Sequence, residues 1–376
     1  MKKIYYITAV FATLFLVGCG DGIDLPGVNV ETDLNKIPLP DNNVNLEQVE
    51  LKPSTEPMLH EGLHTEEDFQ RIRDKKAAGE EPWISAYQLL VESQFSQKTA
   101  DTYPTEWIKR GISGDENYMN AARGATIVYQ QALRWKIEQD DEYAAKAVEN
   151  LNKWVQTCVG VTGNTNLSLA AGLYGYEFAI AGELLRDYGG WDRADFAAFQ
   201  NWLLKVFYPA NDDFLKRHHD TNALHYWANW CLCNIAAKMA IGIVTDRRDI
   251  YNEGIAHLQT GDTNGRLRRA IYHDYAPDYN FAQWQESGRD QGHTLMCVGL
   301  MGIICQLAWS QGDDFFAYDD NLFLRACEYA ACCNYTNETV PYTTYIWQKQ
   351  SQWGYPIPEE QTALGGGKWI KRAIWA

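Results

Sequence analysis

Apolar positions recur at intervals of three and four residues along most of this 376-residue chain. That spacing is typical of helices that bury one face. It predicts helices over residues 117–139, 142–158, 167–188, 193–208, 224–243 and 248–259. A further run, 295–309, is almost wholly apolar, and glycine positions such as 111, 160, 163, 189, 190 and 261 separate these stretches.

The pattern contains no convincing pair of strands joined by a hairpin turn. Helices joined by short loops over about 300 residues indicate an all-α fold, either an (α/α) toroid or a helical solenoid. The closed toroid is favoured because no sequence repeat of fixed period occurs. We therefore expect helical hairpins arranged around a central groove.

The N-terminus has the features of an export signal. Lys2 and Lys3 precede an apolar run that is too short to span a membrane and that ends at Gly18-Cys19. This is the bacterial lipoprotein pattern, so residues 1–18 are expected to be removed and Cys19 to be lipidated. The protein would then be lipid-anchored to a bacterial membrane, facing the periplasm or the cell surface, with no other contact to the membrane.

Residues 19–57 are rich in Asp, Asn, Gly and Pro without periodicity, which predicts a flexible tether. The folded domain is expected over residues 58–376. Near its start Thr65 and Asp68 have the spacing of a capping box for a helix through Lys76. Another helix is expected to begin near Pro82.

The net charge of −16 argues against nucleic acid and against an anionic membrane surface as partners. The 14 Trp and 22 Tyr residues suit either a ring-rich core or a groove in which aromatic rings stack on sugars. The cysteines after Cys19 lack the spacing of a zinc or redox motif, so buried free thiols are expected, with a disulfide as the alternative in an oxidising compartment.

The densest polar stretch is 283–294, which holds two acids, three amides, an arginine and a histidine just before the apolar run. Such clusters are costly to desolvate and tend to occur where they do chemistry. A capping segment is the alternative, with Ser287 or Asp290 as the cap. A cap needs one such residue, so we interpret the stretch as a functional site.

A second polar stretch, 218–230, contains three histidines. His218 and His219 are adjacent and would point apart on a helix, and no carboxylate lies at ligand spacing from His225. We therefore expect no metal ion and no other cofactor.

The residues suit proton chemistry on a sugar acid. Eliminating across the C4–O bond of a uronate requires removal of the C5 proton while donors neutralise the neighbouring carboxylate. A base must reach that proton, and an acid must protonate the departing oxygen. The stretches offer donors and possible bases in Asn222, His225, Arg289 and His293, and phenols in Tyr226, Tyr272 and Tyr279.

The chain resembles the alginate lyase superfamily of polysaccharide lyases, in particular its bacterial alginate and glucuronan lyase branch. The resemblance covers about residues 58–376 and is carried by residues 62–65, 225–230, 283–294 and 308–312. It implies an (α/α) toroid, often without a tightly bound cofactor, that cleaves uronate polymers by β-elimination. Family members continue beyond a segment like 365–370 with further helices, which implies a toroid that is incomplete at its C-terminus.

The resemblance also implies site residues. Members have an Asn-His pair before Tyr-Trp, whereas this chain has Leu224-His225, so the amide would come from Asn222 or Asn229. The family's catalytic tyrosine falls on His293, counted back from Gly312. Either His293 does the acid/base work, or it neutralises charge and Tyr272 or Tyr279 supplies the phenol. In the leading assignment His225 or a tyrosine is the base, a tyrosine is the acid, and Arg289, His293 and Asn222 hold the carboxylate.

Arg289 corresponds to the family's arginine-bearing turn, and Tyr272 is favoured over Tyr279 because it follows Arg268 and Arg269. The side chains expected to bind substrate are Tyr226, Trp227, Asn229, Trp230, Gln283, Trp284, Gln285 and Glu286, although tryptophans in such a pattern are more often core residues than a sugar platform. Two other functions stay open. One is a surface glycan-binding lipoprotein without activity, and the other is an unsaturated-glucuronide hydrolase using Glu286 and Asp290.

Overall fold

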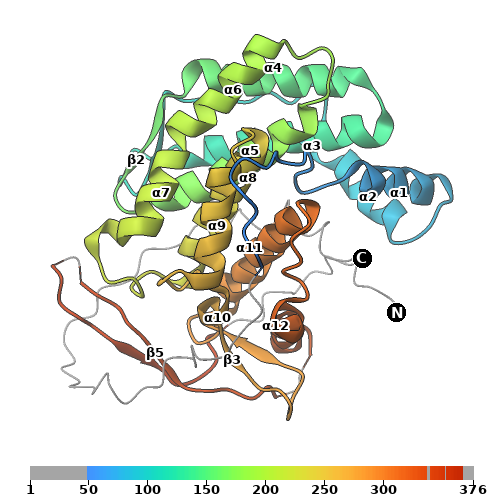
Figure 1. Ribbon diagram of the computed structural model, residues 1–376. Helices are drawn as coiled ribbons and strands as arrows, with labels where there is room; N and C mark the ends of the chain where they lie inside the picture. The colour runs from blue at the N-terminus through green and yellow to red at the C-terminus, as the bar shows by residue number, and fades with distance from the viewer. Residues whose placement is uncertain (1–48, 337–338, 352, 367–376) are drawn as a thin grey trace.

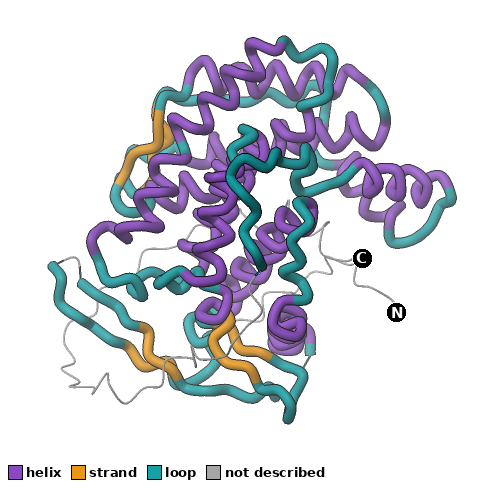
Figure 2. Tube along the Cα trace, viewed as in Figure 1, coloured by secondary structure: helices purple, strands orange, loops and turns teal. Residues whose placement is uncertain are grey.

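The computed structural model describes residues 49–336, 339–351 and 353–366 (Figures 1 and 2). Helices dominate, and the strands are short. The helices are α1 (Glu66–Ala77), α2 (Trp83–Glu92), η3 (Gln94–Ser96), α3 (Tyr118–Glu138), α4 (Asp141–Thr157), α5 (Leu167–Leu185), α6 (Arg193–Val206), α7 (Tyr208–Arg217), η4 (His218–Asp220), α8 (Ala228–Val244), α9 (Arg248–Thr260), α10 (Leu267–Ala270), α11 (Gln291–Ser310) and α12 (Tyr318–Tyr335). The strands are β1 (Trp107–Arg110), β2 (Gly160–Gly163), β3 (Ile271–Asp274), β4 (Ala282–Trp284), β5 (Tyr345–Trp347) and β6 (Glu359–Gln361).

Helices α3, α5, α8 and α11 pack side by side in chain order as an inner row, and α4, α6, α7, α9 and α12 lie outside it (Figure 1). Sequence dictates this division. Helix α5 buries 17 of its 19 residues, as expected for a helix that is apolar all round. Helix α4 buries 7 of its 17 residues along one face. The architecture is the predicted all-α toroid of inner and outer helices.

The predicted helices are present, with corrections at their ends. The stretch 193–208 is broken at Phe207, because Pro209 cannot continue the hydrogen-bond ladder of α6 and instead starts α7. Helix α8 begins at Ala228 and not at Leu224. The Thr65–Asp68 capping box is confirmed.

The expectation of no paired strands was wrong. Strands β1 and β2 pair in parallel, and β3–β4 and β5–β6 pair antiparallel. Each strand has only three or four residues, too few for an alternating pattern to stand out.

Three contacts bring the N-terminal ends of the inner helices to one face. The β1–β2 pair joins the chain entering α3 to the chain entering α5. Ser168 at the start of α5 lies 3.0 Å from His219 of η4, just before α8. Asn229 in the first turn of α8 donates to Glu286, just before α11. Both polar stretches found in the sequence therefore lie on the same face of the molecule.

Residues 49–57, which the sequence placed in the tether, lie on the folded domain. The backbone N–H of Val49 donates to Oε1 of Gln259 at 2.7 Å, and Arg248 donates to the carbonyl of Pro57 at 2.8 Å. The predicted signal peptide, Cys19 and residues 367–376 lie outside the described residues.

The core explains two further sequence features. Cys158, Cys231, Cys297 and Cys305 are buried free thiols, as predicted. Helix α11 is long and apolar enough to cross a membrane by length and composition. It packs against α8 and α12, so its apolar character reflects burial in the core.

Candidate active site

Glu286 lies at the centre of the predicted polar cluster. Its side chain is fully buried, and Oε1 accepts from the backbone N–H and the side-chain amide of Asn229 at 2.8 and 2.6 Å. Oε2 accepts from Nη1 of Arg289 at 3.1 Å. A buried carboxylate needs several donors to offset its desolvation. This carboxylate therefore links the segment that precedes α11 to the first turn of α8.

Arg289 is held between this carboxylate and an aromatic face. Its guanidinium carbon lies 5.2 Å from the ring centre of Trp227, a cation–π contact, while its side chain keeps 23% of its surface exposed. Nε lies 3.8 Å from Oδ2 of Asp290. Glu286 and Trp227 thus hold the guanidinium of Arg289 in place, and part of its charged surface faces solvent.

Asp290 caps α11 and orients His293. Its Oδ1 accepts from the backbone N–H of His293 at 2.8 Å, and its Oδ2 lies 2.6 Å from Nδ1 of the same histidine. Burial raises the pKa of Asp290, but the hydrogen bonds from His293 outweigh burial and leave that pKa below its ordinary value. A carboxylate can only accept, so Nδ1 of His293 carries a proton, and in the neutral ring Nε2 is the basic nitrogen.

His225 and Asn222 lie in the loop before α8 and are both engaged by the C-terminal part of the chain. Nδ1 of His225 accepts from the backbone N–H of Gln350 at 2.8 Å. Both side-chain N–H groups of Asn222 have acceptors, the carbonyl of Gln348 at 3.1 Å and Oε1 of Gln350 at 3.0 Å. The amide of Asn222 is therefore used inside the protein, and so is the amide of Asn229, which donates to Glu286.

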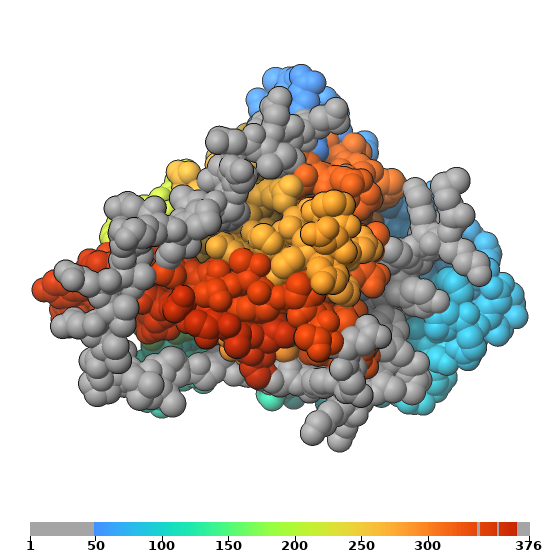
Figure 3. Space-filling model, turned by 90° about the horizontal axis from the view of Figure 1, so that it is seen from below, coloured from blue at the N-terminus to red at the C-terminus, as the bar shows by residue number. Residues whose placement is uncertain are grey.

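The described residues between 339 and 366, the C-terminal segment, cover this face (Figure 3). Trp347 of β5 stacks on Trp227 with ring centres 4.2 Å apart. The hydroxyl of Tyr345 donates to the carbonyl of Gln285. The backbone N–H of Gly365 donates to the carbonyl of Ser287 at 2.8 Å, and a Cβ at this position would lie 2.3 Å from the carbonyl carbon of Arg289, so a larger residue would displace the contact.

The two candidate tyrosines are placed differently. Tyr272 of β3 is half-buried, and its ring lies 4.8 Å from that of Tyr345, which contacts the 285–288 turn. Burial raises the pKa of Tyr272 above its ordinary value. Tyr279 is 54% exposed and packs edge-on against Tyr275. Tyr272 therefore lies against Tyr345, which contacts the turn that carries Arg289, whereas Tyr279 packs on Tyr275.

Several predicted substrate-binding residues are buried with internal partners. Trp284 is fully buried and donates to the carbonyl of Ala326 at 2.9 Å. Gln283 is fully buried between Tyr275 and Thr343. Gln285 accepts from the first N–H of α8 at 3.1 Å. These side chains and Glu286 build the scaffold under Arg289 and offer no free face to a sugar.

The aromatic residues before α8 form one cluster. Tyr226 packs against Trp230 at 4.7 Å, against His225 at 4.7 Å and against Phe214 at 5.1 Å, and it is nearly buried. Trp230 keeps part of its surface exposed. This cluster supports the loop that carries His225.

The histidines of the 218–230 stretch do not converge. His218 is buried beside Cys231, and His219 contacts Ser168 of α5. Among the described residues, no three His, Cys, Asp or Glu side chains gather in a metal-binding arrangement.

The comparisons with known proteins agree with this picture. The alginate lyase family matches residues 73–338, which is more than half of the chain. The chain belongs to the alginate lyase family. None of the curated proteins searched matches it.

Solved structures similar to this alginate lyase family member support the fold. A His-to-Ala variant of alginate lyase A1-III complexed with tetrasaccharide has a TM-score of 0.56 and 14% identity over 76% of this chain and 82% of that chain. A Tyr-to-Phe variant of that lyase, also with tetrasaccharide, has a TM-score of 0.54 and 14% identity over 75% and 81%. Alginate lyase A1-III from Sphingomonas species A1 has a TM-score of 0.51 and 14% identity over 74% and 80%.

Sequence reasoning missed the C-terminal segment of this family member. Tyr345, Trp347 and Gln350 contact the cluster and were not among the candidates. A signal was present, because residues 342–347 are rich in aromatic and β-branched residues and Gly354 and Pro356 follow. That pattern is typical of a strand followed by a turn.

Proposed function

We propose that this protein cleaves a uronate polymer, such as alginate or glucuronan, by β-elimination at the face where α8 and α11 begin. The observation that carries the proposal is Arg289, a partly exposed cation that is fixed by buried Glu286 and that shares Asp290 with His293. The N-terminal ends of the inner helices add partial positive charge to this face. An overall acidic protein thus has a local site for an anionic polymer. An acidic polysaccharide is its expected partner.

The geometry favours particular roles. Arg289 would hold the carboxylate of the uronate and stabilise the charge that builds on it. His293 would take the C5 proton through Nε2, because Asp290 holds its other nitrogen protonated. The C5–H electrons would form the C4–C5 double bond, the C4–O bond would break, and Tyr272 would give a proton to the departing oxygen.

The test is the ultraviolet absorbance of the unsaturated product when the mature protein is incubated with alginate and with glucuronan. We expect a rise with one of them that falls by at least about 100-fold in Arg289→Ala and His293→Ala variants. Asp290→Asn should retain the helix cap but lose much of kcat, because an amide can stabilise the wrong tautomer of His293. Tyr279→Phe is the control and should keep full activity.

A second candidate is a glycan-binding protein without activity. Trp353 and Tyr355, which are 76% and 69% exposed near the end of the β5–β6 hairpin, favour contact with sugars. If no polyuronate gives unsaturated product while binding is retained, this candidate replaces the lyase.

We also propose that the protein is a lipoprotein anchored through Cys19 to a bacterial membrane, facing the periplasm or the cell surface. The support is the sequence of residues 1–19. Metabolic labelling with a fatty-acid analogue should mark the wild type and not Cys19→Ala. A labelled Cys19→Ala variant would contradict the assignment.

A further inference from the structure

His225 receives a hydrogen bond whose direction is fixed by chemistry. The backbone N–H of Gln350 points at Nδ1 of His225, 2.8 Å away. A backbone N–H can only donate, so Nδ1 must be the unprotonated nitrogen of the ring. In neutral His225 the proton is therefore on Nε2.

The ring is also held in its neutral form. Burial, followed by the positive charge of Lys349, lowers the pKa of His225 to about 4. Nε2 of His225 makes no hydrogen bond to any residue that the structure describes. At neutral pH the half-buried ring thus offers one donor, its Nε2–H.

The β5–β6 hairpin, described over residues 345–351 and 353–361, contacts the His225 loop at several points. Nε1 of Trp347 donates to the carbonyl of His225 at 2.6 Å, and the two rings stack at 6.2 Å with 12° between their planes. Oε1 of Gln350 accepts from the backbone N–H of Asn222 at 2.6 Å. Hydrogen bonds to its backbone and contacts with its side chains thus hold the His225 loop against the hairpin.

We propose that the β5–β6 hairpin completes the active site, and that Gln350 is a positioning residue that holds His225 as the Nε2–H tautomer. His225 then donates a hydrogen bond to the substrate carboxylate, alongside Arg289, and is not the base. This assignment rests on the proposed lyase function. The two histidines then have opposite roles. Nδ1 of His225 accepts a hydrogen bond, which leaves Nε2–H as a donor, whereas Nδ1 of His293 donates to Asp290, which leaves Nε2 as a base.

The test is nitrogen NMR of the protein labelled in its histidines, with the His225 signals assigned by their loss in His225→Gln. The expected wild-type spectrum at neutral pH shows a protonated Nε2 and an unprotonated Nδ1 for His225. A spectrum with the proton on Nδ1 would overturn the proposal. This readout needs no catalytic activity, so it fails or succeeds independently of the lyase assignment.

Two variants at one position separate the backbone contact from the side-chain contact. Gln350→Pro removes the N–H, so the tautomer preference should weaken and kcat should fall at least about 10-fold. Gln350→Ala keeps the N–H and loses only the contacts to Asn222, so the Nε2–H tautomer should persist. A Gln350→Pro variant with wild-type tautomer and kcat would contradict the proposal. The wild-type spectrum decides even if that variant does not fold.

Discussion

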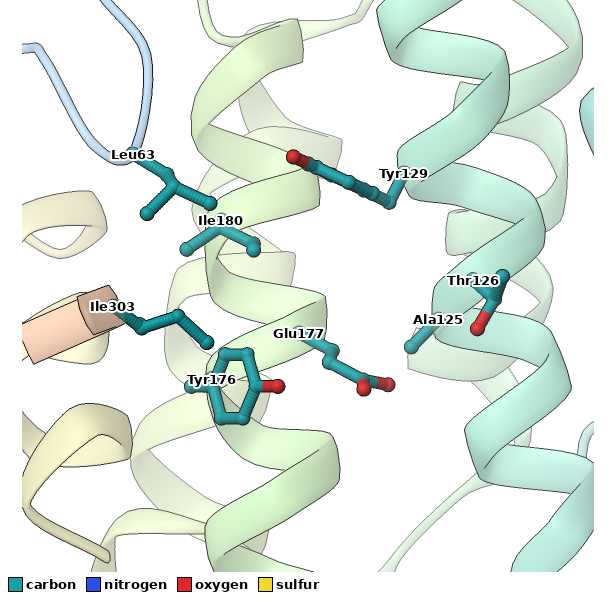
Figure 4. A pocket seen from close by; sticks show the side chains of 8 residues that line it. All are labelled: Leu63, Ala125, Thr126, Tyr129, Tyr176, Glu177, Ile180 and Ile303. Carbon is teal, nitrogen blue, oxygen red and sulfur yellow. The ribbon is translucent and has the colours of Figure 1, made fainter. Parts of the chain in front are cut away.

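Two glutamates of the toroid differ in their surroundings and therefore in their chemistry: Glu286 is fully buried, and Glu177 is half-buried at the wall of a small cavity. Glu286, before α11, is surrounded by donors: the backbone and side chain of Asn229 and the guanidinium of Arg289. Glu177, in α5, lines a cavity of about 40 Å³ with Leu63, Tyr129 and Ile303 (Figure 4). Its Oε2 is buried and has no hydrogen-bond partner among the described residues.

The protonation states follow from these surroundings. Burial raises the pKa of Glu177 to about 8, and burial lowers the pKa of nearby His64 to about 4. His64 pairs with the hydroxyl of Tyr129 at 2.5 Å. The cavity region is therefore largely uncharged at neutral pH, whereas the Glu286 region holds a paired charge with an exposed cation. A polar cluster on the inner helices can bind an anionic substrate only where it includes a positively charged side chain that reaches the surface, as Arg289 does.

The same substitution at both glutamates should separate the two regions most strongly. Glu286→Gln removes a carboxylate that accepts from four donors and leaves Arg289 with only Asp290, 3.8 Å away, as a counter-charge. We therefore expect the free energy of unfolding to fall by about 3 kcal/mol. Glu177→Gln replaces a mostly protonated acid with a neutral amide of similar shape. Because the unfolded acid is ionised at pH 7 and the amide is not, this substitution should raise the free energy of unfolding by about 3 kcal/mol at that pH. Urea unfolding measures both, and equal losses would refute the comparison.

Removing one hydroxyl from each region is the next test. Tyr272→Phe should lower kcat about 100-fold without lowering the unfolding midpoint, because the phenol is proposed to protonate the departing oxygen. Tyr129→Phe removes the partner of His64 and should leave kcat within about twofold. Both are measured by product absorbance beside a thermal melt. A larger kcat loss in Tyr129→Phe would move the chemistry to the cavity.

The sequence predicted the helices and the Glu286 region because both depend on local patterns. Apolar spacing located α3 to α6, α8 and α9 but not α7, and the run of polar residues before α11 located Glu286, Arg289, Asp290 and His293, which the structure does bring together. It misjudged Gln283 and Trp284, since a strand buried on both faces shows no alternation that separates scaffold from surface.

Long-range contacts determine the features of the site that the sequence did not predict. Gln350 donates to His225, which lies 125 residues earlier in the sequence. No local pattern specifies which loop a hairpin will cover. The sequence analysis did not single out Glu177 within the apolar run of α5, because its protonation depends on a cavity that Leu63 and Ile303 line from distant parts of the chain. Tertiary packing determines whether a polar residue is paired, exposed or isolated. The two glutamates show that these surroundings in turn determine whether the side chain is charged at neutral pH.

The smallest expected effect is a pH dependence that reports Glu177 alone. Its pKa is raised from 4.5 unfolded to about 8 folded, so the folded state binds more protons and stability falls as pH rises between these values. His64, His218, His225 and His257 act in the opposite direction, because their pKa values are about 4 in the folded state and their unfolded rings still bind protons near pH 6.5. Between pH 6.5 and 8 the free energy of unfolding of the wild type should therefore fall relative to that of Glu177→Gln, by up to about 1.4 kcal/mol per pH unit.

The Glu177→Gln variant supplies the control, because it has no titrating group at this position and keeps the contributions of the histidines. The difference between the two curves therefore reports Glu177. The lowered histidine pKa values, such as about 4 for His218, His225 and His257, keep those side chains neutral in the folded state throughout this window. Urea unfolding at closely spaced pH values measures the slope. An equal slope in wild type and variant would mean that Glu177 is hydrated and ionised at neutral pH, and the contrast with Glu286 would then rest on its counter-ion and not on burial.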